Sequence, residues 1–173
     1  MNENFSSEYI ISSLEKNSSV FKSLFSNLSE DEIRFRQSPE KWCLLEAACH
    51  LYDEEREDFR ARVKSTLENP SAEWIKINPP EWVTERKYME QNFEERVLAF
   101  LAERKNSIAW LRSLENPNWE NAYIHPKVGA VRASLLLSNW LAHDYLHIRQ
   151  ITKLKYDYLK SICGEKLDYA GEW

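Results

Sequence analysis

The feature that most constrains the fold of this chain is a set of four long stretches in which apolar residues recur at helical spacing. They run from about residues 7 to 27, 42 to 68, 84 to 114 and 130 to 163, and in each one the apolar side chains fall on one side of a helix. The chain has only three glycines, too few for the frequent tight turns of a many-stranded sheet protein. The sequence therefore predicts an all-α protein, a four-helix bundle in a single domain over residues 1–173.

Each predicted helix carries its own apolar stripe, and three of them end at a clear stop signal. Asn69-Pro70 ends the second helix and Asn116-Pro117 ends the third, while Gly164 suits the left-handed position that follows a helix. The stripes consist of Ile10, Leu14, Phe21, Phe25 and Leu28; Leu44, Ala48, Leu51, Phe59 and Val63; Met89, Phe93, Val97, Phe100, Ile108 and Leu111; and Leu136, Trp140, Ile151, Leu154 and Tyr158.

The connections between the helices, at about residues 28–42, 69–83 and 118–129, are long. In the first, Ser29 followed by Glu32 predicts a capped short helical turn. The second is rich in tryptophan and proline, which indicates an ordered loop rather than a flexible linker. Long connections permit crossovers, so an up-up-down-down order of helices is as compatible with the pattern as up-down-up-down.

The charge and the cysteine content of the chain indicate which binding partners and which cellular compartment to expect. The net charge is −5 with acidic and basic residues intermixed, so we expect no nucleic acid partner. We also expect no membrane partner, because no apolar run approaches a membrane span and the first residues do not resemble a signal peptide. Three cysteines without a C-x-x-C pair fit a reducing, cytoplasmic location and give no zinc-ribbon signal.

Two of the four histidines, His143 and His147, lie four residues apart on the apolar stripe of the fourth helix. Both imidazoles are therefore expected to point into the bundle, one turn apart, where their nitrogens could converge on one metal ion. The alternative is a pair of buried neutral histidines with hydrogen-bond acceptors nearby, because burying imidazoles without partners is costly. Helical spacing alone leaves both readings open.

His50 lies outside the apolar stripe of the second helix, on a side that also carries Glu46, Asp53, Glu54 and Glu57. It could be an ordinary surface histidine beside carboxylates. It could also face a cleft toward the fourth helix, where a cation would meet an imidazole and an excess of negative charge. Three histidines with one open coordination position form a ligand set suited to zinc or nickel.

Three segments together resemble a known family. They are PEKWCLLEAACHLYDEE from Pro39, HPKVG from His125 and HDYLHIRQ from His143, and they are similar to the DinB-like (damage-inducible) superfamily of metal-binding four-helix bundles over about residues 29–154. The resemblance implies that His50, His143 and His147 bind a divalent metal in an up-up-down-down bundle that forms a homodimer. It also implies a thiol-dependent transferase, using a low-molecular-weight thiol, or a hydrolase.

One position departs from this family pattern. The residue after Trp42 is often a serine in the family, and here it is Cys43. Because cysteine is a poor helix cap, the start of the second helix is less well defined than the metal ligands.

Several further residues are candidates for roles around such a metal. Asp53 and Asp144 could act as general base or orient the histidines, and Gln150 could orient His147. Arg104 lies on the apolar stripe of the third helix, where it could bind a substrate carboxylate or pair with a buried acid. His125 could act as a proton shuttle or merely shape its loop, and Cys49 should point away from the metal.

Three classes of function follow from these patterns. The first is a metal-dependent enzyme acting on a small-molecule substrate, either by hydrolysis or by thiol transfer, since an open metal position can activate water or a thiol. The second is a metal- or ligand-binding bundle without catalysis. The third, a metal-free interaction module, is disfavoured by two histidines facing the core. Acidic residues near His50 favour the first class over the second.

Overall fold

The apolar stripes form four long helices in the computed structural model, which describes residues 5–171. They are α1 (Ser7–Leu24), a continuous helix made of α3 (Leu44–Glu54), the π-helical turn η1 (Glu55–Phe59) and α4 (Arg60–Glu68), then α6 (Phe93–Ser113) and α7 (Ala133–Cys163). The short elements are α2 (Glu30–Arg34), α5 (Pro79–Glu85), the 3-10 turns η2 (Tyr88–Glu90) and η3 (Asp168–Ala170), and the strands β1 (Ala122–His125) and β2 (Gly129–Arg132). The predicted four-helix bundle is confirmed.

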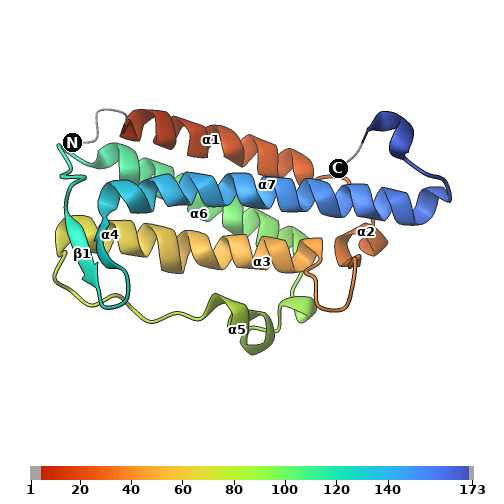
Figure 1. Ribbon diagram of the computed structural model, residues 1–173, viewed down its shortest axis with the longest axis horizontal. Helices are drawn as coiled ribbons and strands as arrows, with labels where there is room; N and C mark the ends of the chain where they lie inside the picture. Colours follow the sequence, from red (N-terminus) through yellow and green to blue (C-terminus); the bar gives the residue numbers. More distant parts are fainter. Residues whose placement is uncertain (1–4, 172–173) are drawn as a thin grey trace.

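The directions of the helices correct one detail of the prediction. α1 and α7 run the same way, because Asn17 contacts Asp144 and Leu24, further along α1, contacts Lys155, further along α7. The α3–α4 helix and α6 run the opposite way (Figure 1). The order along the chain is therefore up-down-down-up, and not up-up-down-down.

The physical reason for this order lies in the lengths of the connections. Consecutive helices that run parallel need a connection that returns along the whole bundle. Residues 69–92 do this, passing along the outside of the bundle and including α5 (Figure 1). The other two connections turn back at one end, so the helices they join are antiparallel.

Two helix starts also differ from the prediction. The third helix begins at Phe93 rather than near residue 84, because Lys87 adopts a left-handed backbone with φ 48° and separates α5 from η2. Asn92 then caps α6 by accepting a hydrogen bond from the Glu95 amide at 2.9 Å. The fourth helix begins at Ala133 because residues 122–132 form the two-stranded hairpin β1–β2, which the sequence did not predict.

The predicted caps have distinct outcomes. Ser29 accepts a hydrogen bond from the Glu32 amide at 3.2 Å, and Gly164 is left-handed with φ 68° after α7; both predictions are confirmed. At the start of α3, the Cys43 amide donates to the Glu46 carboxylate at 2.9 Å. The helix therefore begins at Leu44 and is capped by Glu46 rather than by the cysteine side chain.

Two separate apolar clusters form the core, one toward each end of the bundle. One cluster includes Phe21, Phe100 and Ile151, and the other includes Leu14 and Trp140. The layer between them contains buried polar side chains from all four long helices, namely Asn17, Glu55, Arg104, Ser107 and Asp144; we call these five residues the polar layer. No helix within residues 5–171 has the length and apolar character to cross a membrane.

Candidate metal centre

Three histidines from two helices converge beside the polar layer. His143 Nε2 on α7 lies 3.0 Å from His147 Nε2 and 3.3 Å from His50 Nε2 on α3. Their ligand atoms all lie within 4.8 Å of one another. The His143 and His147 pair follows from the i, i+4 spacing on α7, whereas the approach of His50 depends on the packing of α3 against α7.

The separation of these nitrogens fits a metal ion. With metal–nitrogen bonds of about 2.0–2.1 Å, two ligands of a tetrahedral ion lie roughly 3.3 Å apart. The two shorter nitrogen–nitrogen distances, 3.0 and 3.3 Å, are close to that value. Each neutral imidazole has one N–H donor and one nitrogen lone pair. Three Nε2 atoms that all present lone pairs repel one another unless a cation lies between them and is bound by all three.

The histidines are held in the neutral form that a metal requires. Burial lowers the pKa of His50 to about 3, of His143 to about 2 and of His147 to about 4. Removal from water disfavours the charged imidazolium, and the neighbouring rings add to the effect at His50 and His143. All three imidazoles are therefore uncharged at neutral pH and able to act as ligands.

Aromatic side chains fix the orientation of two of the rings. The Trp42 ring lies 4.7 Å from the His50 ring, and the Phe59 ring lies 4.9 Å from the His143 ring, measured between centroids. The Nδ1 atoms of His50 and His147 are buried and make no hydrogen bond within the described residues. The Nε2 atoms are thus the ones that these rings present to a shared ion.

Comparison with known proteins agrees with this arrangement. Residues 13–151, which include all three histidines, match the family model described as the DinB superfamily. The chain belongs to the DinB superfamily. No curated protein matches it.

A solved structure shares the fold of this DinB-superfamily chain. This structure is YfiT from Bacillus subtilis, and its description calls that protein "a probable metal-dependent hydrolase with an unusual four-helix bundle topology". The two structures superpose with a TM-score of 0.79 over 91% of this chain and 92% of that one, at 17% sequence identity. At this identity the similarity establishes the four-helix fold.

Arg104 does not contact a substrate site. Its guanidinium is 1% exposed and is bound on two sides, by Glu55 Oε1 at 2.9 Å and by Asp144 at 2.7 Å. Trp140 Nε1 donates to the second Glu55 oxygen at 2.8 Å. Of the two alternatives for Arg104, the structure therefore favours pairing with buried acids.

The two aspartates that were candidates for catalysis are also engaged elsewhere. Asp144 is bound by Arg104 and accepts a hydrogen bond from Asn17 at 3.0 Å. Asp53 accepts from Tyr88 at 2.7 Å and pairs with Arg86 at 2.8 Å. Neither carboxylate hydrogen-bonds a histidine, so the structure does not support a base or orienting role for them.

The acidic surroundings predicted for His50 are largely neutralised by arginines. Glu46 pairs with Arg36 at 2.7 Å. Asp53 and Glu57 share the two arginines Arg56 and Arg86. The remaining acid, Glu54, is buried, and its pKa is raised to about 8 by burial and by its neighbour Asp58, so it is mainly uncharged at neutral pH. The expected excess of negative charge beside His50 is therefore not present.

The remaining candidates separate into one near the site and two away from it. Gln150 lies close to His147, and its side-chain hydrogen bond acts to raise the pKa of His147 against the effect of burial. This contact is compatible with an orienting role. His125 Nδ1 accepts a hydrogen bond from the Lys127 amide at 3.2 Å, so it shapes the β1–β2 turn. Cys49 points toward the Tyr88 carbonyl, 4.0 Å from its sulfur, and away from the metal site as predicted.

Trp42 and Phe59 were not predicted as parts of the site. Trp42 lies outside α3 and Phe59 was placed on the apolar stripe. The spacing of residues along one helix could not predict their contacts with His50 and His143, because those contacts form where different segments of the chain pack together.

Proposed function

We propose that this chain is a metal-dependent enzyme in which His50, His143 and His147 bind one divalent ion and hydrolysis of a small-molecule substrate takes place at its open position. The observation that carries this proposal is the convergence of three neutral Nε2 atoms at spacings suited to a tetrahedral ion. The description of YfiT as a probable metal-dependent hydrolase supports the same reaction class. Zinc and nickel are the metals that this ligand set favours.

An ion bound by three neutral ligands keeps its full positive charge, which lowers the pKa of a coordinated water to about 7 and can equally deprotonate a thiol. The residues of the chain would do the rest. Trp42 and Phe59 pack against two of the rings and would hold them in place. Asp144, next to His143 in sequence, acts to raise the pKa of His147, whereas Arg104, which pairs with Asp144, acts to lower that of His143.

A groove beside the site could receive the substrate. Trp42 and Gln150, which lie next to His50 and His147 respectively, line a surface cavity of about 390 Å³ together with apolar Leu146. Lys41 and Arg149 also line it, which favours a substrate with an anionic group. A low-molecular-weight thiol that carries a carboxylate would have the same features, so thiol transfer is the second candidate reaction.

Metal content and turnover of matched variants test this proposal. Purified wild-type chain should contain about one zinc or nickel ion, and His147→Ala should lose it. His125→Ala is the matched control, because His125 lies in the hairpin and contacts Lys127 rather than the cluster; it should keep the metal. A chain that binds no divalent metal, or a His147→Ala variant with unchanged content, would refute the metal site.

A substrate screen then separates the reaction classes. Hydrolysis of ester, amide or lactone probes should depend on the metal and should be independent of added thiol. A requirement for a low-molecular-weight thiol would favour the transferase instead. Tight metal binding without turnover of any probe, accompanied by a large loss of stability on chelation, would favour the binding module without catalysis.

A further inference from the structure

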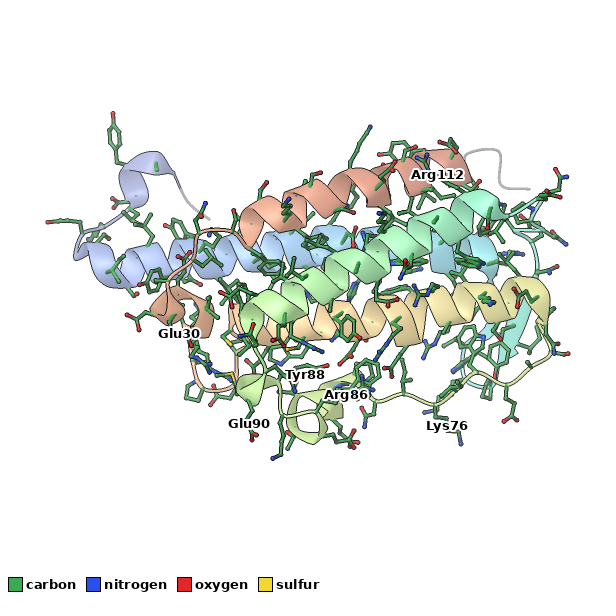
Figure 2. The ribbon with its side chains drawn as sticks, turned by 180° about the vertical axis from the view of Figure 1, so that it is seen from behind. Glu30, Lys76, Arg86, Tyr88, Glu90 and Arg112 are labelled. Atoms are coloured by element: carbon green, nitrogen blue, oxygen red, sulfur yellow. The ribbon has the colours of Figure 1, made fainter. Side chains whose placement is uncertain are left out.

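A second cavity lies on the outer side of α3, between this helix, the α5–η2 segment and α6. Its volume is about 330 Å³, within the range of sites for small molecules. One wall is a single helix face formed by Cys49, Tyr52, Asp53, Arg56 and Glu57, and the other consists of Arg86, Tyr88, Gln91 and Arg96. Figure 2 shows Arg86 and Tyr88 on the segment that passes along the side of α3 away from α1.

Both acids of the cavity are already paired. Arg86 lies 2.8 Å from Asp53 Oδ1 and 2.7 Å from Glu57 Oε2. Its guanidinium also lies over the Trp82 ring, 4.1 Å from the centroid, so it is fixed on three sides. The Tyr88 hydroxyl donates to the other oxygen of Asp53 at 2.7 Å. These groups form a rigid wall rather than free binding groups.

Arg56 is also committed to the wall. It pairs with Glu57 and donates to the Tyr52 hydroxyl at 2.9 Å. Its guanidinium carbon lies 4.7 Å from the centre of the Tyr52 ring. Two arginines, Arg56 and Arg86, therefore neutralise the two carboxylates of the cavity.

Arg96 is the third arginine of the cavity and has no carboxylate partner within residues 5–171. Its Nε is buried and makes no hydrogen bond, as is also true of Arg56 Nε, but Arg56 has ion pairs with Asp53 and Glu57. Its guanidinium lies 5.1 Å from the centre of the Tyr52 ring, on which Arg56 also packs. A buried guanidinium N–H without an acceptor is unfavourable, and the lining as a whole carries three arginines against two acids.

We propose that this cavity binds a small organic monoanion, a monocarboxylate, whose carboxylate pairs with Arg96. A planar carboxylate matches the paired N–H groups of a guanidinium, and Arg96 lines the cavity without a carboxylate partner among residues 5–171. A single negative charge balances the excess of one arginine. A phosphate dianion fits less well, because Asp53 and Glu57 lie in the same cavity and like charges repel at short range.

This site is distinct from the candidate metal centre. Cys49 lines the cavity and His50 belongs to the metal cluster, and consecutive residues of an α-helix point about 100° apart. No histidine of the cluster lines the cavity, although Asp53 and Glu57 of its wall lie toward the His50 side of the helix. Binding of the monoanion requires no metal, so it can be tested independently of the proposed enzyme.

The experiment is a titration of the purified full chain, freed of metal with a chelator, at constant ionic strength. Propionate and benzoate are the monocarboxylate probes and inorganic phosphate is the comparison, followed by calorimetry and by amide shifts in NMR spectra. We expect saturable binding of at least one monocarboxylate, with the largest shifts at Tyr88, Gln91 and Arg96. Binding should persist in the metal-free His147→Ala variant, whatever the outcome for metal and turnover.

Variants of two arginines on the same helix complete the test. Arg96→Gln should weaken binding by at least about 10-fold, whereas Arg112→Gln, which removes an exposed arginine at the other end of α6 (Figure 2), should leave it unchanged. Circular dichroism and thermal melting would establish that both variants remain folded. Absence of saturation with both carboxylates, equal affinity in Arg96→Gln, or tighter binding of phosphate would overturn the proposal.

Discussion

Arg104 donates to both carboxylate oxygens of Asp144, with Nη1–Oδ2 and Nη2–Oδ1 distances of 2.7 Å each. The two side chains are 1% and 0% exposed, and Glu55 binds the same guanidinium from the α3–α4 helix. Asn17 and the Leu14 carbonyl of α1 bond the same pair, so all four long helices are joined in the polar layer, directly beside His143. This network fixes α7 relative to α3, which is the relationship on which the histidine cluster depends.

The first prediction concerns the stability supplied by this buried network. Asp144→Asn leaves the buried Arg104 charge with Glu55 as its one carboxylate partner and the Leu14 carbonyl as a neutral acceptor, so we expect the free energy of unfolding to fall by about 3–5 kcal/mol. Urea denaturation measures it. Glu15→Gln is the matched control, since Glu15 pairs with Arg112 at the surface, where a loss of at most about 1 kcal/mol is expected. A similar loss of unfolding free energy in both variants would contradict the conclusion that the buried ion pair stabilises the fold more than the surface pair.

The second prediction concerns stabilisation by metal. A ligand that binds only the folded chain raises the free energy of unfolding, by about 2.7 kcal/mol when its free concentration is 100 times Kd. Zinc should therefore raise the melting temperature of the metal-free wild type and of His125→Ala, but not of His143→Ala. Calorimetric melting with and without zinc measures this. Equal stabilisation of His143→Ala would mean that the ion binds elsewhere.

The third prediction concerns the pH dependence of metal binding. A protonated imidazole cannot bind a metal, and the pKa values of the three histidines lie at about 4 or below. Zinc affinity should therefore stay nearly constant between pH 7 and pH 5.5 and fall only as the pH approaches 4. Three imidazoles with the ordinary pKa of about 6.5 would lose roughly 600-fold over the same interval. Calorimetric titration at the two pH values distinguishes these outcomes.

The fourth prediction concerns Glu54, whose pKa is raised to about 8 by burial and by the nearby Asp58. The folded chain holds this proton more tightly than the unfolded chain, so its contribution to stability is fully present below about pH 4.5. That contribution is lost as the pH rises toward 8, at no more than about 1.4 kcal/mol per pH unit. Urea denaturation at pH 5, 6.5 and 8 should show the decline.

A comparison of two glutamine variants isolates this effect. Glu54→Gln has no proton to lose and should show a smaller decline in unfolding free energy than wild type over the same pH range. Glu94→Gln replaces an exposed glutamate on α6 and should retain the wild-type dependence. The assignment fails if the Glu54→Gln profile matches that of wild type.

The fifth prediction concerns thiol reactivity. Burial raises the pKa of Cys49 to about 12 and also raises that of Cys43, and both side chains are buried. Because the thiolate is the reactive form, we expect only the partly exposed Cys163 to react with a thiol reagent at pH 8. Ellman's reagent should count one thiol in the native chain and three after denaturation. Rapid labelling in a Cys163→Ser variant would contradict this order.

Some assignments remain predictions. They are the homodimer, the cytoplasmic location, the low-molecular-weight thiol, the choice between zinc and nickel, and the small-molecule substrate.

The sequence by itself determined the features that depend on local spacing. Apolar periodicity identified four helices, Ser29 and Gly164 marked helix ends, and the i, i+4 spacing placed His143 and His147 side by side on α7. Such features need only the geometry of one helix. The hairpin β1–β2 escaped prediction because strands of four residues are too short for a reliable alternating pattern.

Only the tertiary structure decided which side chains from different helices meet. It brought His50 to the pair on α7, joined Arg104 to Asp144 and Glu55 instead of to a substrate, and paired the acids near His50 with arginines. The sequence around a charged residue on a helix does not show whether its side chain faces water or pairs with a buried side chain of opposite charge. The free-energy difference between these two environments depends on desolvation and on pairing between helices. Spacing along one helix gives no information on either.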